Sequence, residues 1–577
     1  MKKISYLILI LFGILFTGCE KDLLEKTPLD QISDPDFWTS ETDLELYLNN
    51  FYDLFEGWWV SGGGAAPTYD RGTDLALPPP NVYGNDWTPR LDGVISVPAS
   101  GGGWSWGDVR DVNYFLENSS RVEEGGPMTD HYIGEGYYFR AHFYFELFKQ
   151  FGALPIITKP VNAEDVDILY GARNSRTEVA NFILSDLDMA ISKMKHGSEL
   201  ATHGTRLSKD IALLFKARVA LYIGTWEKYH SGTVFAGSTD GSGFIEQARD
   251  ASKQVMDDAN YSLVSGDPNS VYMDMFNLVD YSNHPEVLFY KHYDRETYGS
   301  DFSNQMWNWP NAYGITQDLT KYYLCTDGLP TAVSPLFVGD SILSLVEVNR
   351  DPRLAQTIMV PGDIRRIDGG DTTIYEYPDL YNCGTGYESQ KFRHIVVDPA
   401  VGPENGNVDY IFFRFAEALL IYAEAKAELG TITQADIDMT INQLRERVGM
   451  PGLNMASITP DPNLPDYGYP LADVLQEIRR ERTIELYGEG FRFDDLMRWR
   501  ADKMIVGKRF TGTYYTDELR EVDANMPVNE DGYLDPLMFT LTGPDNGYGF
   551  DPGRDYLLPI PSNELTLNEN LDQNPGW

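Results

Sequence analysis

The feature that most constrains the fold is a series of segments in which apolar residues recur every three or four positions. In residues 43–55, Leu44, Leu48, Phe51 and Phe55 would lie on one side of an α-helix. Segments with the same periodicity cover residues 108–121, 134–151, 178–195, 210–222, 244–259, 411–429, 434–448, 473–487 and 491–500. Because each such helix has to bury its apolar side against a neighbour, the pattern predicts a mainly α-helical fold.

One pair of these segments indicates how the helices are arranged. Residues 411–429 are rich in alanine, and the short stretch 430–433 joins them to residues 434–448. A helix with many small residues, a short turn and a second amphipathic helix resemble a tetratricopeptide-type hairpin. No strict repeat period is visible, so we expect a degenerate tetratricopeptide-like helical-repeat scaffold that is interrupted by insertions.

Other parts of the chain lack this periodicity. Residues 57–106 combine glycine and proline clusters with Trp58, Trp59, Trp87, Trp104 and Trp106. Between about residues 262 and 400, β-prone runs such as 287–293 and 394–397 alternate with turns. We therefore expect a large irregular, loop-rich second lobe that contains few short strands.

The same patterns divide the chain into regions. Residues 41–260 form an N-terminal region with helical repeats and the long aromatic loop. Residues 261–577 form a C-terminal region with the irregular ligand lobe, helices at 411–448 and 472–500, and an extended C-terminus.

The N-terminal residues have the pattern of a leader. Lys2 and Lys3 precede an apolar run at residues 4–16, which is shorter than the roughly 20 residues that a membrane-spanning helix needs. Thr17, Gly18 and Cys19 resemble a bacterial lipobox, in which the cysteine is lipidated. We therefore expect a lipoprotein signal peptide at 1–18 and a lipidated N-terminus and tether at 19–40, with acyl chains that anchor the protein to a membrane.

Charge and cysteine content narrow the classes of function. The chain has 46 Lys and Arg against 87 Asp and Glu, a formal net charge of -41. Such a surface repels nucleic acid and other polyanions, whereas a neutral glycan is indifferent to it. With Cys19 in the leader, Cys325 and Cys383 either pair with each other or remain two separate buried thiols.

Five motifs, in order, resemble the SusD/RagB family of outer-membrane nutrient-binding lipoproteins, the starch-utilisation-system type. They lie at residues 137–158, 414–430, 441–453, 478–500 and 556–577. The resemblance runs essentially end to end. It implies four tetratricopeptide-like helix pairs under a mostly irregular second lobe, and a TonB-dependent SusC-like outer-membrane transporter as the partner. Glu20, Lys21 and Asp22 also resemble sorting signals of surface-exposed lipoproteins in Bacteroidetes, which implies a position facing the cell exterior.

The most recognisable residues have a structural interpretation. Glu481, Arg482 and Glu485, with Arg479 and Arg480, stand at spacings at which ion pairs form along a helix. Prolines in the stretch 557–561 fix an extended segment that we expect to pack across the helices.

No pattern of an enzyme or a cofactor site is visible. The chain has no G-x-S-x-G, H-E-x-x-H or P-loop motif. His142 and Glu146 stand four residues apart, but within a predicted scaffold helix. We expect a binding protein without catalysis, cofactor or metal site, and nothing in the sequence supports a role for calcium.

Two stretches combine aromatic rings with hydrogen-bonding side chains, as a site for sugars requires. The candidate contact residues are Tyr298, Trp307, Trp309, Asn311 and Tyr313 in the stretch 298–314, and Tyr83, Asn85, Trp87 and Arg90 in the stretch 83–90. The competing interpretation is that these aromatic side chains hold together a lobe with little regular structure.

The sequence supports three hypotheses about function. The leading one is a glycan-binding lipoprotein that delivers oligosaccharides to the transporter. The alternative is a RagB-like, peptide-binding lid of a peptide-importing transporter. The third is a structural lid with little ligand affinity of its own.

Overall fold

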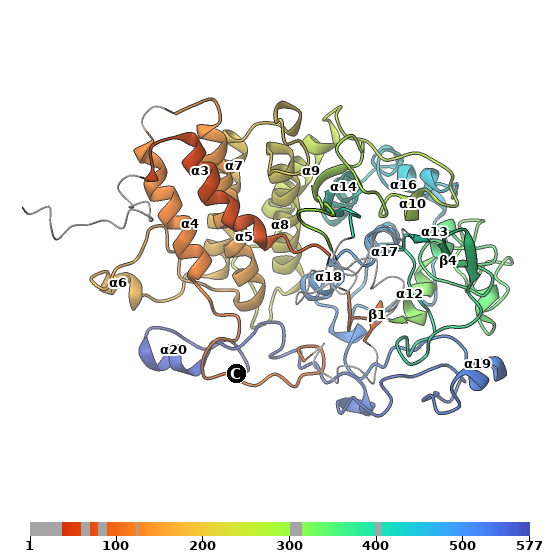
Figure 1. Cartoon of the computed structure of the whole chain (residues 1–577). Helices are drawn as coiled ribbons and strands as arrows, with labels where there is room; N and C mark the ends of the chain where they lie inside the picture. The colour runs from red at the N-terminus through yellow and green to blue at the C-terminus, as the bar shows by residue number, and fades with distance from the viewer. Residues whose placement is uncertain (1–36, 59–69, 79–88, 123–124, 301–313, 398–405) are drawn as a thin grey trace, which may run out of the picture.

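The computed structural model describes residues 37–58, 70–78, 89–122, 125–300, 314–397 and 406–577. One half of the molecule consists of helices that lie side by side (Figure 1). These are α3 (Glu41–Asn49), α4 (Gly107–Asn118), α5 (Thr129–Phe151), α7 (Arg176–Lys193), α8 (Lys209–Tyr229) and α9 (Ser242–Met256). Within this group, α5 packs most extensively on α7, and α8 on α9, which is the helix-pair arrangement of a tetratricopeptide-like scaffold.

The ends of these helices follow from local residues. At the start of α7, Ser175 Oγ accepts a hydrogen bond from the Glu178 backbone N–H, and the Glu178 carboxylate accepts one from the Ser175 N–H. This capping box satisfies two N–H groups that a helix start leaves without partners. Helix α5 ends at Phe151 because Gly152 adopts φ +73°, a backbone angle that favours glycine.

A second group of helices continues the scaffold. It contains α14 (Phe415–Glu428), α15 (Gln434–Asp438), α16 (Ile441–Arg447), α17 (Asp473–Leu486) and α18 (Arg492–Arg498). Helix α14 packs on α9 and on α17, so the two groups share one hydrophobic core. The predicted mainly α-helical fold with a tetratricopeptide-like scaffold is confirmed.

The helix expected from residue 411 begins later than predicted. Residues Tyr410–Arg414 form strand β7, which pairs antiparallel with β2 (Val287–Lys291), and α14 begins only at Phe415. Aromatic residues such as Phe412 and Phe413 suit a strand as well as a helix. The pairing with β2, more than a hundred residues earlier in the chain, decides between the two.

The helix expected at 434–448 is divided in two. Thr440, between α15 and α16, has φ -131° and ψ -89°, which are not helical angles. Its side-chain Oγ1 donates to the Asp436 carbonyl at 2.6 Å. A threonine that bonds back in this way offers the backbone an alternative to the helix, which explains the break.

The other half of the molecule is irregular, as predicted, with short helices and strands (Figure 1). Its helices are α10 (Val271–Asp274), α12 (Gln317–Tyr322), α13 (Pro352–Ala355) and α19 (Asp517–Val522). Two other short helices, α6 (Val166–Leu169) and α20 (Ser562–Leu567), lie beside the helical half (Figure 1). The remaining strands of the irregular half are β1 (Ala76–Leu77), β3 (Gly314–Ile315), β4 (Ile364–Asp368), β5 (Asp371–Ile374) and β6 (Val396–Val397). The β-prone runs at 287–293 and 394–397 do contain strands, namely β2 and β6.

The strands form three small sheets: β1 with β3, β2 with β7, and the order β5-β4-β6. Strand β1 belongs to the N-terminal region and β3 to the C-terminal region, so this sheet joins the two regions.

The C-terminal segment packs across the helices, as the two prolines predicted. Leu558 N–H donates to the Gln150 carbonyl at 2.8 Å, and the Asn574 side-chain amide donates to the Phe151 carbonyl at 3.1 Å. Leu557 and Ile560 are buried in the main core. The last residues of the chain therefore satisfy the carbonyls that α5 leaves free at its end.

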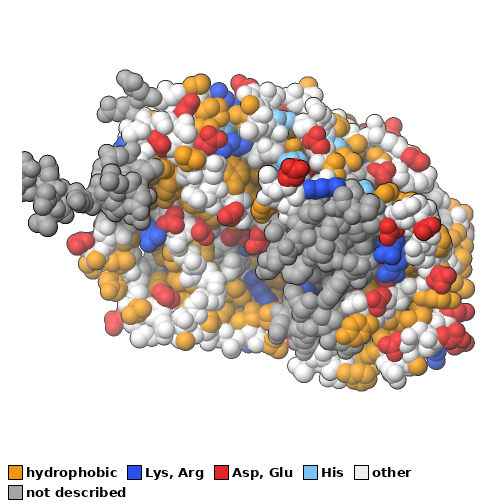
Figure 2. Space-filling model, in the orientation of Figure 1, with side chains coloured by type: hydrophobic (Ala, Val, Ile, Leu, Met, Phe, Trp, Pro, Cys, Tyr) orange, Lys and Arg blue, Asp and Glu red, His pale blue; other side chains and the backbone are white. Residues whose placement is uncertain are grey.

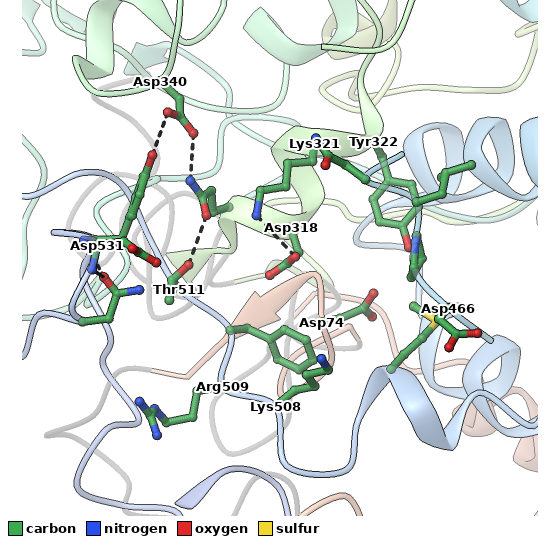
Figure 3. A pocket seen from close by; sticks show the side chains of 18 of the residues that line it. Asp74, Asp318, Lys321, Tyr322, Asp340, Asp466, Lys508, Arg509, Thr511 and Asp531 are labelled. Carbon is green, nitrogen blue, oxygen red and sulfur yellow. Dashed lines mark hydrogen bonds and ion pairs between the residues drawn. The ribbon is translucent and has the colours of Figure 1, made fainter. Parts of the chain in front are cut away.

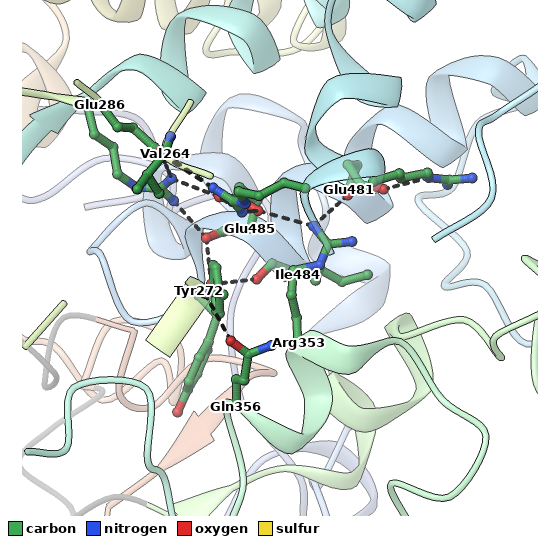
Figure 4. A network of polar contacts seen from close by, with 12 residues as sticks. Val264, Tyr272, Glu286, Arg353, Gln356, Glu481, Ile484 and Glu485 are labelled. Atoms are coloured by element: carbon green, nitrogen blue, oxygen red, sulfur yellow. Dashed lines mark hydrogen bonds and ion pairs between the residues drawn. The ribbon is translucent and has the colours of Figure 1, made fainter. Parts of the chain in front are cut away.

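Helix α17 is the centre of a buried ionic network (Figure 4). The fully buried carboxylate of Glu485 contacts Arg414 Nη1 at 2.7 Å, Arg447 Nη2 at 2.7 Å and Arg353 Nη1 at 3.1 Å. Burial alone would raise the pKa of Glu485, but the three guanidinium groups outweigh it and hold this pKa well below its usual range.

The ion pairs of α17 differ from those expected along the helix. Arg482 pairs with Asp495 at 2.8 Å and Arg479 with Glu428 at 3.0 Å, both on other helices. One pair within the helix remains, Arg480 with Glu477, three residues apart. Because α17 is surrounded by other elements, its charged side chains find partners across the interfaces.

The two described cysteines, the surface charges and the helix lengths each bear on a prediction from the sequence. Among the described residues, Cys325 and Cys383 are both buried and not disulfide-bonded. Acidic and basic side chains are interspersed with apolar ones over the described part of the face in Figure 2. Across the described ranges, no helix combines the length and the apolar composition that crossing a membrane demands.

Candidate functional site

The residues predicted to contact a ligand lie on two stretches whose flanks the structure describes. Outside the described residues lie Cys19, Tyr83, Asn85, Trp87, Trp307, Trp309, Asn311 and Tyr313. Arg90 and Tyr298 are described.

The flanks of the two stretches are paired with each other. Leu77, at the end of β1, pairs with Gly314, the residue that directly follows 301–313. At the other flank, Ser300 and Gly406 exchange two backbone hydrogen bonds of 2.9 and 2.7 Å. The described residues that border 79–88, 301–313 and 398–405 are thus paired with one another, and we call these two pairings the loop anchor.

Tyr298 presents an aromatic face beside the loop anchor. Its ring stacks on that of Tyr293, with centroids 5.7 Å apart and an interplanar angle of 16°. Tyr298 is 45% exposed whereas Tyr293 is 1% exposed, so a buried ring supports an open one. Lys291 Nζ lies 5.3 Å from the centroid of the Tyr298 ring, a cation–π contact.

A tight turn fixes the position of Tyr298. Asp294 and Tyr298 exchange backbone hydrogen bonds of 3.0 and 2.9 Å. The Asp294 carboxylate accepts from both the N–H and the hydroxyl of Thr297, each at 3.0 Å, and these bonds lower the pKa of Asp294. A carboxylate that accepts main-chain N–H bonds in this way stabilises the turn.

Asp409, which directly precedes β7, contacts the residues that follow β2. Its buried carboxylate accepts from the Tyr293 N–H at 2.9 Å and lies 3.0 Å from His292 Nδ1. Burial raises the pKa of Asp409 to about 6, although these two hydrogen bonds oppose the effect. Trp58 Nε1 donates to the Asp409 carbonyl at 3.2 Å, and Trp58 is buried. The support under Tyr298 is thus continuous with the core.

The guanidinium group of Arg90 is hydrogen-bonded to the C-terminal segment of the chain. Its Nε donates to the Asp555 carbonyl at 2.7 Å, and its Nη2 donates to the Tyr556 carbonyl. The guanidinium also lies 5.3 Å from the centroid of the Phe493 ring. In this structure Arg90 holds the C-terminal segment in place.

The remaining described tryptophans of the aromatic loop are packed. Trp104 contacts Trp106 and Phe151 edge-on, with ring centroids 5.4 and 4.9 Å apart, and both tryptophans lie against the main core. Trp104 and Trp106 therefore pack at the entrance of α4, which begins at Gly107.

A hollow of about 750 Å³ lies at the other end of the β1–β3 pair (Figure 3). Asp74 precedes β1 and Gln317 follows β3, so both line the hollow at the end of the pair where Ala76 lies opposite Ile315. The lining residues are Asp74, Gln317, Asp318, Lys321, Tyr322, Asp340, Asp461, Asn463, Leu464, Pro465, Asp466, Lys503, Met504, Lys508, Arg509, Phe510, Thr511, Asn529, Asp531 and Tyr533.

The polar groups of this hollow are organised by hydrogen bonds. Asp340 accepts from Gln317 Nε2 at 2.8 Å and from the Tyr533 hydroxyl at 2.9 Å. Burial and this hydrogen bond raise the pKa of Tyr533 to about 12. Burial also raises the pKa of Asp318, whose carboxylate lies 3.7 Å from Lys321 Nζ. Neutral donors and acceptors beside paired charges suit a hydroxyl-rich, uncharged ligand.

No sequence pattern predicted this hollow. Its lining comes from positions as distant as Asp74 and Tyr533, on the short helix α12 and on several loops. Long-range contacts bring these segments together, among them the pairing of β1 with β3 and the hydrogen bond from the Gln317 N–H to the Thr511 carbonyl.

Comparison with known proteins connects this arrangement to a family. Residues 285–577 match a profile described as "SusD family", and residues 105–221 match one described as "Starch-binding associating with outer membrane". A SusD-like protein, P38, of Formosa agariphila is 26% identical over 88% of this chain and 92% of its own length.

Solved structures show the same fold. A SusD-like protein from Bacteroides fragilis is 23% identical, with a TM-score of 0.70 over 96% of this chain and all of that chain. A SusD-like carbohydrate binding protein from the same species is 21% identical, with a TM-score of 0.71 over 93% of this chain and all of that chain.

Proposed function

Because the chain belongs to the SusD family, we propose that it captures oligosaccharides at the outer membrane and delivers them unchanged to a TonB-dependent, SusC-like transporter. An outer-membrane association agrees with the family description of residues 105–221. In this proposal Cys19 carries the lipid anchor, and the folded body faces the cell exterior.

The observation that carries the proposal is the exposed ring of Tyr298 stacked on the buried Tyr293. A sugar ring has an apolar C–H face that packs on an aromatic ring, and its hydroxyl groups need hydrogen-bonding neighbours. The buried ring holds Tyr298 in one orientation, so little side-chain freedom is lost on binding. The carbohydrate-binding relative from Bacteroides fragilis supports a ligand of this class.

The proposed contact residues come from the stretches 83–90 and 298–314. Tyr298 is the described member of the set. The others are Tyr83, Asn85, Trp87, Trp307, Trp309, Asn311 and Tyr313. Since Arg90 is already bound to two main-chain carbonyls, its first role is in the scaffold.

Calorimetric titration of the full chain with a panel of oligosaccharides tests the proposal. We expect reversible binding in the micromolar-to-millimolar range with no change in the ligand. Replacing Tyr298 with Ala weakens it about 3- to 10-fold, the value of one aromatic contact. Tyr170→Ala is the matched control, because Tyr170 is 50% exposed and directly follows α6 beside the helical half (Figure 1).

Each other outcome decides against a part of the proposal. Release of shortened sugars contradicts the non-catalytic role. Binding of peptides and not of glycans assigns the chain to the RagB-like alternative, and a flat titration with both assigns it to a structural lid. Co-purification with a SusC-like barrel tests the transporter partner separately.

A further inference from the structure

Three metal-ligating side chains meet between α8 and α9, in the helical half of the molecule. His196, Asp210 and Asp258 each offer a ligand atom, and these atoms all lie within 4.8 Å of one another, the one such group in the described ranges. His196 precedes the short 3₁₀-helix Gly197–Glu199, Asp210 lies in the first turn of α8, and Asp258 follows α9. Three separate segments therefore supply the three donors.

The distances fit a small divalent ion. His196 Nδ1 lies 2.6 Å from Asp210 Oδ1 and 3.8 Å from Asp258 Oδ2. An ion held at about 2.0–2.2 Å from each donor in tetrahedral geometry separates the donors by roughly 3.3 Å. The first distance has to lengthen and the second to shorten by a fraction of an ångström, and the ligand atoms of Asp210 and Asp258 lie within 4.8 Å of each other. His196 and Asp258 are partly exposed, whereas Asp210 is buried. Asp258 Oδ1 accepts from the Asn260 N–H at 3.0 Å and from its Nδ2 at 2.8 Å, which leaves Oδ2 for the ion.

The buried carboxylate is already oriented. Asp210 Oδ2 accepts from the Gly197 N–H at 2.8 Å and from the Tyr261 hydroxyl at 3.2 Å, which leaves Oδ1 facing His196. Carboxylates that bind metals are commonly fixed by such outer hydrogen bonds.

A second imidazole lies near the residues that orient Asp210. His203 Nδ1 is shielded from solvent and has no hydrogen-bond partner among the described residues, although the side chain as a whole is partly exposed. A Cβ at Gly197 would lie 2.9 Å from this nitrogen and 3.1 Å from Tyr261 Oη, so His203 lies beside the two residues that orient Asp210. A shielded nitrogen without a partner costs free energy, which a bound water or ion nearby can offset.

The cluster opens into a hollow of about 540 Å³. Glu199 and Asp257 line it beside Asp210 and Asp258, against a single lysine, Lys209. The excess of carboxylates favours a cation at this place. The hollow also leaves room for water to complete the coordination.

We propose that His196, Asp210 and Asp258 bind one divalent transition-metal ion, with Zn²⁺ as the best match. Imidazole with carboxylates suits Zn²⁺, whereas Ca²⁺ takes six to eight oxygen ligands. The bound ion ties the start of α8 to the chain that follows α9. The site is separate from the loop anchor and does not depend on the proposed glycan binding.

The test is titration of Zn²⁺ into the untagged, chelator-treated full chain, followed by calorimetry and by thermal unfolding. We expect one tight equivalent and a rise in Tm. Asp258→Asn weakens binding about tenfold or more and abolishes the rise in Tm. Asp257→Asn, which removes the same charge from the same hollow one residue away, changes affinity less than about threefold. Tm of the metal-free variants shows that both fold.

Other results overturn the assignment. If both variants weaken binding equally, or if Ca²⁺ competes as well as Zn²⁺, the carboxylates attract cations only diffusely. If no equivalent of Zn²⁺ binds, or Asp258→Asn binds as tightly as the unaltered chain, the three residues are not a metal site.

Discussion

Helix α17 and the turn that carries Tyr298 differ in what their side chains require, because α17 buries charged groups and the turn exposes an aromatic ring. In α17 the side chains of Glu477, Arg479, Arg480, Glu481, Arg482 and Glu485 are all buried. Each needs a partner of opposite charge at hydrogen-bond distance, since an unpaired buried charge is very costly. At Tyr298 the ring is 45% exposed and is supported by Tyr293 and Lys291. The first region therefore fixes residue types one by one, while the second requires only that an exposed ring be supported.

The largest effect is expected at the centre of α17. Glu485→Gln leaves Arg353, Arg414 and Arg447 without their shared carboxylate. Breaking a buried ionic group in this way costs about 3–5 kcal/mol, measured as the loss in free energy of unfolding in urea. Glu446→Gln, an exposed position on α16, is the control and changes it by less than about 0.5 kcal/mol. A loss below about 1 kcal/mol for Glu485→Gln would show that the network is not needed.

The next effect is the loss of stability in acid. Burial alone would raise the pKa of Glu424, but Arg498, at 2.6 Å, outweighs it and holds this pKa at about 2. A carboxyl whose pKa is lowered on folding stabilises the fold above its unfolded pKa of about 4.3. This contribution, up to about 3 kcal/mol, disappears as the pH falls from about 5 towards 2. Urea midpoints of the unaltered chain between pH 7 and pH 3 measure it.

Glu424→Gln cannot be protonated at this position, so its stability should fall less steeply over the same pH range. Parallel pH profiles for Glu424→Gln and the unaltered chain would rule out this origin.

Substitution of Arg90 tests whether this residue stabilises the fold or contacts the ligand. Arg90→Gln removes donors to the Asp555 and Tyr556 carbonyls and should cost about 1–3 kcal/mol of unfolding free energy, while glycan affinity changes less than about twofold. The opposite result, intact stability with lost affinity, would place Arg90 among the ligand contacts that the sequence predicted.

The smallest effect on stability is expected at Tyr298. Tyr298→Ala removes a ring that is 45% exposed, so the free energy of unfolding should change by less than about 1 kcal/mol. A change as large as that of Glu485→Gln would mean that Tyr298 is part of the support and not of the binding face.

The sequence predicted the scaffold well because helical periodicity is a local signal. The segment 134–151 corresponds to α5, whose register follows from its own apolar residues. The predicted start of α14 was wrong because residues 410–414 fit either a helix or a strand, and their distant partner β2 decides between the two.

The ion pairs predicted along α17 were wrong for a similar reason. The partners of Glu485, which are Arg353, Arg414 and Arg447, come from three separate elements.

The candidate site was predicted only in outline. Composition identified Tyr298, but not the ring of Tyr293 that supports it or the pairing of Leu77 with Gly314. The cluster that we propose as a metal site was not predicted either. His196 and Asp210 are 14 positions apart, a spacing that fits no metal motif, and the fold brings in Asp258 from after the next helix.

The contact between Asn574 and Phe151 has a consequence for how the chain is made. These residues are 423 positions apart, and the amide of one satisfies the carbonyl at which α5 ends. During synthesis the first helices emerge long before the residues that complete them. The end of α5 therefore stays without these contacts until residues 557–574 have been made, and a chain that ends before them lacks the contacts that close this part of the scaffold.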